Sequence, residues 1–236
     1  GGGMKGAAAV LVQRMNSLRS ALESADLHWG GLLVDHQISA LVRTVYDPQS
    51  ALLIEHYEDL DRTIEDAGPM AVKEHWTHLV SDSGYHRVYW IAEWPRRKTH
   101  PGFLHPLIMD STLVRTINHI FEPVPTATSL EAARKERQQL EARAGERAEK
   151  GRVTTRAHDR ESEDLDRHEN DLVAGALELR HAALITVSSL SADDLSRDCD
   201  NLVHLAKKAG LSPRVVAGQQ MALFAAAALP LGRGFK

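Results

Sequence analysis

The sequence predicts an α+β fold in which two small α/β sandwich lobes carry a long charged helical hairpin inserted between them. Three observations support this. Runs rich in β-branched and aromatic residues alternate with helical periodicity in the first and last parts of the chain. The content of 43% hydrophobic and 25% charged residues is ordinary for a globular protein. Over residues 129–171 the composition changes abruptly to alternating acids and bases.

The first lobe is expected over residues 7–126, after a cloning remnant and disordered start at 1–6. Apolar residues recur at helical spacing over 7–25, which predicts an amphipathic helix packed on a sheet. Residues 29–34 are expected to form a short strand. Asp35 is then expected to cap the next helix.

The rest of this lobe is expected to contain two helices and two strands. Pro69 favours the first turn of a helix whose buried side would include Trp76. The β-branched and aromatic run at 86–94 predicts a strand, and 112–124 is expected to be another. Between them, 103–109 is expected to form a short helix.

The inserted hairpin is expected over residues 127–180. Acids and bases four residues apart support two long helices, which Gly151 would separate. Leucines and alanines gather on one side of each helix, with Leu140 on the first and Leu172 on the second. We expect these sides to pack together and the hairpin to project from the lobes.

The second lobe, residues 181–236, is expected to complete the sandwich. A β-branched run predicts a strand at 181–189, and Ser191 begins a capping box for the following helix. A further strand at 214–217 and a helix of small residues at 219–228 are expected to follow.

Composition excludes several classes of function. The formal net charge of −4 gives no overall attraction to nucleic acid or anionic lipid. Cys199 is the only cysteine, so no internal disulfide and no zinc site of several thiolates can form. The chain also lacks a G-x-x-x-x-G-K-[ST] phosphate loop.

The histidine pairs are weak candidates for chemistry. His75 and His78 would lie one helical turn apart and could hold a metal, but no third ligand is evident nearby. His100 and His105 flank a Pro-Gly turn, where loop residues of these types are common. We therefore expect no catalytic, cofactor-binding or metal-binding residue. A metal-dependent enzyme that uses paired histidines is a further hypothesis.

A basic segment after the strand at 86–94 is a candidate for nucleic-acid binding. Trp94 is followed by Arg96, Arg97 and Lys98, and such a combination can stack on bases and bind phosphates. The alternative is an ordinary strand end at the surface.

Three stretches together carry a family resemblance: YWIAEWPR at 89–96, PGFLHPL at 101–107, and 218–234, which opens with GQQ and closes with LPLGRG. The chain from about residue 18 to 234 resembles actinobacterial conjugal-transfer and type VII secretion EccE-like proteins. Their carboxyl-terminal portion is similar to the amino-terminal domain of conjugative type IV secretion ATPases.

The resemblance implies a non-catalytic assembly domain of a membrane-associated apparatus at the cytoplasmic face of the cell membrane. Its expected partners are the motor ATPase and channel subunits, with transmembrane helices upstream and no cofactor. A homo-oligomer is a further expectation, and a nucleic-acid-binding module is the alternative function. The expected interaction residues are Trp94, Arg96, Arg97, Lys98, Arg137, Arg147, Arg160, Gln219, Gln220 and Arg233.

Overall fold

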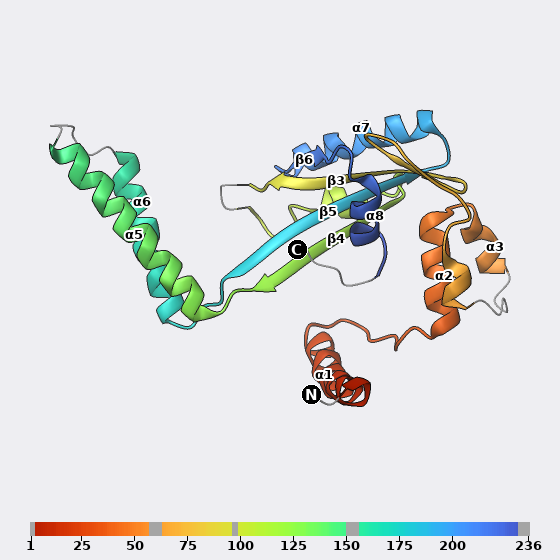
Figure 1. The fold of residues 1–236 in the computed structure, drawn as a ribbon, viewed down its shortest axis with the longest axis horizontal. Helices are drawn as coiled ribbons and strands as arrows, with labels where there is room; N and C mark the ends of the chain where they lie inside the picture. The colour runs from red at the N-terminus through yellow and green to blue at the C-terminus, as the bar shows by residue number, and fades with distance from the viewer. Residues whose placement is uncertain (1–2, 57–62, 96–98, 150–155, 231–236) are drawn as a thin grey trace.

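The computed structural model describes residues 3–56, 63–95, 99–149 and 156–230, and in them the fold is a mixed α+β arrangement (Figure 1). The helices are α1 (Gly3–Ser24), α2 (Asp35–Tyr46), α3 (Ser50–His56), the 3₁₀ helix η1 (Ile64–Ala67), α4 (His105–Met109), α5 (Thr126–Glu149), α6 (Arg156–Val173), α7 (Ala192–Lys208) and α8 (Gln220–Ala227). The strands are β1 (Val72–Glu74), β2 (Leu79–Ser81), β3 (Gly84–Glu93), β4 (Arg115–Pro123), β5 (Leu179–Ser189) and β6 (Ser212–Val215).

One antiparallel sheet combines strands from both expected lobes. Its order is β1-β2-β3-β5-β4, and β6 pairs with β3 beyond the end of β2. The expected lobe boundary at residue 180 falls inside β5, and β5 pairs with both β3 and β4. The strands of the two expected lobes therefore lie in a single sheet, because the strands that flank the inserted helices are hydrogen-bonded neighbours.

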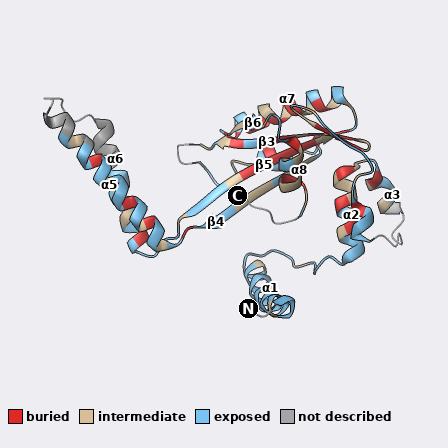
Figure 2. Ribbon diagram, in the orientation of Figure 1, coloured by how far each residue is buried: buried red, intermediate tan, exposed pale blue. Residues whose placement is uncertain are grey.

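Helices cover both faces of the sheet. Alternation along β3 directs Tyr89 and Ile91 toward α7 and α4, where they join one hydrophobic core. Val88 points to the opposite face and packs with Phe224 of α8 and Val42 of α2 in a second core. Figure 2 shows the buried residues gathered along β3, β5 and these covering helices.

Two elements of the first part differ from expectation. Residues 29–34 form no strand, and α2 begins at Asp35 with Val34 as its N-cap residue, whose N–H donates to Gln37 Oε1 (3.1 Å). The helix expected after Pro69 is instead the β1–β2 hairpin. The Asp82 carboxylate accepts from the backbone N–H of Met70 (3.0 Å), which holds this segment extended beside β2.

The first helix does not pack on the sheet as expected. No residue of α1 is buried, and Figure 1 shows the helix apart from the other elements. It begins at Gly3, so residues 3–6 are helical and not a disordered start. Within the described residues, the apolar side chains whose spacing predicted this helix are consequently exposed or only half-buried.

The charged insertion forms two helices that lie side by side. Helices α5 and α6 leave the sheet at the ends of β4 and β5 and extend away from it (Figure 1). We call α5 and α6 together the arm.

Candidate functional site

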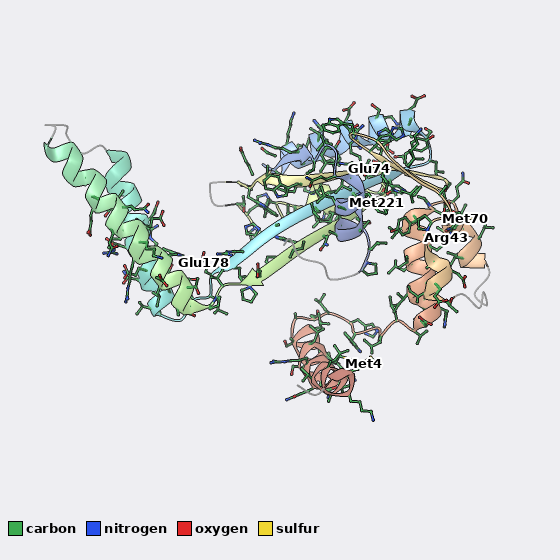
Figure 3. The ribbon with its side chains drawn as sticks, viewed as in Figure 1. Met4, Arg43, Met70, Glu74, Glu178 and Met221 are labelled. Atoms are coloured by element: carbon green, nitrogen blue, oxygen red, sulfur yellow. The ribbon has the colours of Figure 1, made fainter. Side chains whose placement is uncertain are left out.

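The arm is attached to the sheet by a continuous backbone ladder. Pro123 pairs with Leu179 at the end of β4 and β5, and the N–H of Val124 donates to the carbonyl of Glu178 (2.9 Å). Figure 3 shows Glu178 at this junction. The direction of the arm therefore depends on paired strands and not on a free linker.

A narrow seam joins the two helices of the arm. Ala133 and Leu140 of α5 are buried, as is Leu172 of α6. Arg137 adds an electrostatic clamp, because its Nη2 lies 2.6 Å from both Asp166 Oδ1 and Glu169 Oε2. Arg137 is one of the expected interaction residues; its side chain takes part in this clamp and remains 40% exposed.

The outer surface of the arm is exposed and carries both charge signs. Lys135 Nζ lies 2.9 Å from Glu131 Oε1 one turn away, and both side chains are solvent-exposed. The hydrogen bond and charge of Lys135 lower the pKa of Glu131 from its usual value. Such exposed pairs add little to stability, so these charges contribute little to holding the arm together.

A second surface consists of four aromatic side chains, Trp94, His119, Phe121 and His181, which we call the aromatic patch. The Trp94 ring stacks on His119 with centroids 5.1 Å apart, and His119 lies 4.0 Å from Phe121. Phe121 is directly opposite His181 in the β4–β5 ladder. Since odd-numbered residues of both strands share one face, the register brings these side chains together.

The patch is partly accessible to solvent. Burial, followed by the charge of His181, lowers the pKa of His119. His119 Nε2 lies 3.2 Å from His181 Nδ1, while Phe121 remains 55% exposed. Aromatic rings with exposed faces are suited to stacking against another planar or apolar group. Trp94, one of the expected interaction residues, belongs to this patch.

The patch does not form a metal centre of the usual kind. Among the residues that the structure describes, no group of three or more His, Cys, Asp or Glu side chains is placed to hold a metal ion. His119 and His181 supply two nitrogen ligands, one fewer than a catalytic zinc site requires.

The histidine pairs named from the sequence lie in the β1–β2 turn and around the start of α4. His75 and His78 stack with centroids 4.4 Å apart in the β1–β2 turn, where the N–H of His75 donates to the carbonyl of His78 (2.8 Å). Burial first, then the charges of His75 and Arg87, lower the pKa of His78. His100 is exposed and contacts the neighbouring Pro101 carbonyl through Nδ1 (2.8 Å).

The two glutamines expected to bind a partner have different environments. Gln220 is fully buried, its Oε1 accepts from the N–H of Val88 (2.9 Å), and its Nε2 donates to the carbonyl of Val216 (2.7 Å). Val88 lies between the segment of β3 that pairs with β2 and the segment that pairs with β6. The side-chain amide of Gln220 therefore bonds to the Val88 backbone at a point where neither neighbouring strand pairs with β3. Gln220 is therefore unavailable to a partner, whereas Gln219 is exposed.

The remaining expected interaction residues cannot be placed in either surface. Arg96, Arg97, Lys98 and Arg233 lie outside the described residues. Arg147 belongs to α5 and Arg160 to α6, but their side chains are also outside the described part.

The structure also contains a buried histidine cluster that the sequence did not indicate. Ser81 donates its hydroxyl to the Tyr46 carbonyl (2.7 Å), so its oxygen accepts from His86 Nε2 (2.9 Å). His86 Nδ1 then accepts from Ser188 Oγ (2.8 Å). His86 is fully buried. The cluster joins strands and α2, and its burial removes the Ser–His pair from any substrate.

In the described residues, no helix has the combination of length and apolarity needed to cross a bilayer. No protein-family model matches the chain, and no curated protein matches its sequence.

Proposed function

We propose that this chain is a non-catalytic assembly domain of a membrane-associated conjugation or secretion apparatus. It docks onto the motor ATPase or a channel subunit at the cytoplasmic face of the membrane. The arm is the observation that supports this proposal most strongly, and the family resemblance of 89–96, 101–107 and 218–234 supplies the kind of apparatus.

The arm is suited to reach a partner while the sheet stays folded. Helix α5 has 24 residues, which corresponds to a length of about 36 Å at 1.5 Å per residue. The two helices of the arm contact each other through the buried residues Ala133, Leu140 and Leu172 and through Arg137. The other exposed acids and bases are therefore not needed to hold the helices together. We infer that the outer surface of the arm selects the partner by its charge pattern.

The test is a pull-down from host membrane extract, read by mass spectrometry. One variant replaces residues 125–177 with an Asn-Gly turn, which the Val124–Glu178 hydrogen bond allows because the two strands are already paired there. The matched control is Phe121→Ser with His181→Ser, which removes patch rings but keeps the arm. We expect the intact chain and the control to recover a secretion ATPase or channel subunit, and the armless variant to recover neither.

Recovery of the same subunit by the armless variant would contradict the proposal. Far-UV circular dichroism of the armless variant must still show the sheet, so that a loss of binding is assigned to the arm and not to unfolding.

The aromatic patch favours one alternative, a module that binds single-stranded nucleic acid. Trp94 stacked on His119 beside the exposed Phe121 provides faces on which bases could stack. This alternative predicts steeply salt-dependent binding of a labelled oligonucleotide, which Phe121→Ser with His181→Ser would abolish and arm removal would not. The assembly proposal predicts no specific binding of that probe.

A further inference from the structure

Helix α1 carries a continuous apolar seam with the spacing of a coiled coil. Its apolar residues recur at alternating intervals of three and four residues. With Ala8 in heptad position a, the a and d positions hold only apolar residues. They are Met4, Ala8, Leu11, Met15, Leu18 and Leu22.

The described part of the chain buries none of this seam fully: Met15 and Leu22 are half-buried, and the other seam residues are exposed. Leu11 is 62% exposed, Leu18 is 52% exposed and Met4 is 90% exposed, and Figure 3 shows Met4 on a helix that stands apart. Most of the stability of helices in proteins comes from the packing of an apolar face, and α1 has no such packing in the described residues. A partner that covers the seam would remove this apolar surface from water and stabilise the helix.

The charges beside the seam indicate the chemistry of the partner. Lys5 and Arg19 occupy e positions and Arg14 occupies a g position, while the acidic Glu23 lies at b. Arg19 is paired with Glu23 (2.8 Å), and within the described residues Lys5 and Arg14 make no ion pair. The flanks of the seam are therefore predominantly cationic.

These cationic flanks oppose pairing between two copies of the helix. In a parallel pair, the g residue of one helix meets the following e residue of the other, so Arg14 would face Arg19. In an antiparallel pair centred on the seam, the flank that carries Arg14 meets its own copy. Like charges on adjacent flanks are destabilising, so a heterotypic partner is favoured.

We propose that α1 is one strand of a heterotypic coiled coil and that its partner is a helix with apolar a and d residues and Glu or Asp at e and g. This surface is separate from the arm, so the inference does not depend on the proposed docking of the arm. The partner supplies a second apolar seam, which covers that of α1, and acidic side chains opposite its cationic flanks.

The experiment uses the full chain and two synthetic three-heptad peptides as probes. Both peptides have Ile at a and Leu at d, and one carries Glu at every e and g position where the other carries Lys. Fluorescence anisotropy is measured at an ionic strength of about 0.01 M, where charge effects extend furthest. We expect the Glu peptide to bind about tenfold tighter than the Lys peptide.

Three variants test the assignment of individual positions. Arg14→Glu with Arg19→Glu should reverse the preference in favour of the Lys peptide. Leu11→Asn with Leu18→Asn should abolish binding of both peptides. Val10→Asn is the matched control, because Val10 is equally apolar and 58% exposed but lies at the outer c position; it should bind as the unchanged chain does.

Several outcomes would overturn the proposal. One is equal affinity for the two peptides, and another is an unchanged preference after the Arg14 and Arg19 reversal. If the chain self-associates in sedimentation velocity and Leu11→Asn with Leu18→Asn removes this association, the seam binds a second copy of the chain. If the chain binds phosphatidylglycerol vesicles and the same variant does not, the seam binds a membrane surface.

Discussion

At the scale of single residues, buried polar side chains hold the fold together where strand pairing is interrupted. Gln220 shows this most directly, because its amide bonds to the backbone of Val88 between β2 and β6 and to Val216. Gln219 is next to it in the sequence yet exposed. Adjacent identical residues therefore have opposite roles, and only the packing of α8 on β3 distinguishes them.

We predict that Gln220→Ala lowers the free energy of unfolding by about 2 to 4 kcal/mol, because it leaves the buried N–H of Val88 and the part-buried carbonyl of Val216 without partners. Gln219→Ala is the matched control and should change it by less than about 0.5 kcal/mol, as surface substitutions usually do. Urea denaturation measures both. Equal losses in the two variants would show that the amide of Gln220 does not complete the ladder.

At the scale of elements, the arm and the sheet have separate sources of stability. The arm depends on the seam residues Ala133, Leu140 and Leu172 and on Arg137. The β4–β5 ladder continues to Pro123 and Leu179 without contribution from that seam. The two elements should consequently respond to different substitutions.

We predict that Leu140→Asp separates α5 from α6 and leaves the sheet folded, because a carboxylate at this buried position lacks a compensating partner. Amide hydrogen exchange should accelerate in 126–149 and 156–173 while β3 and β5 stay protected. Gln139→Asp introduces the same side chain at an exposed neighbouring position and should leave protection unchanged. Simultaneous loss of protection in the arm and the sheet would mean that the two elements unfold as one unit.

At the scale of the whole molecule, the buried His86 cluster connects elements from both halves of the chain. Ser81 links it to the carbonyl of Tyr46 in α2, and Ser188 links it to β5. Burial lowers the pKa of His86 to about 4 from its usual value of 6.5, with a small opposing effect of the Tyr46 carbonyl. The folded protein therefore holds this imidazole neutral.

We predict that global stability falls as the pH decreases from 6.5 to 4. In this window the unfolded chain binds a proton at His86 that the folded chain rejects, so the His86 contribution is complete above pH 6.5 and is lost toward pH 4. The expected loss is about 3 kcal/mol. Urea denaturation at several pH values, compared with His86→Asn, isolates this contribution.

A second measurement covers the case in which His86→Asn does not fold. Nuclear magnetic resonance of the unchanged chain should show one imidazole that remains neutral down to about pH 5, in keeping with its lowered pKa. An imidazole at position 86 that titrates near pH 6.5 would contradict the predicted pH dependence.

Local patterns determined a large part of the secondary structure. β-branched and aromatic runs identified β3, β4 and β5, and Ser191 caps α7 as expected by accepting from the N–H of Asp194 (3.1 Å). These features depend on neighbours within a few residues. The sequence also indicated the mixed α+β class and both helices of the charged insertion.

Only the tertiary structure decided which of these elements meet. The aromatic patch exists because β4 pairs with β5 in one register, which places Phe121 opposite His181 across an insertion of more than fifty residues. The hairpin in place of a helix after Pro69 depends on contacts with Asp82, and α1 has helical periodicity without a surface to cover. Periodicity records the preference of a segment for helix or strand, whereas burial and pairing depend on residues distant in the chain, which no local pattern specifies.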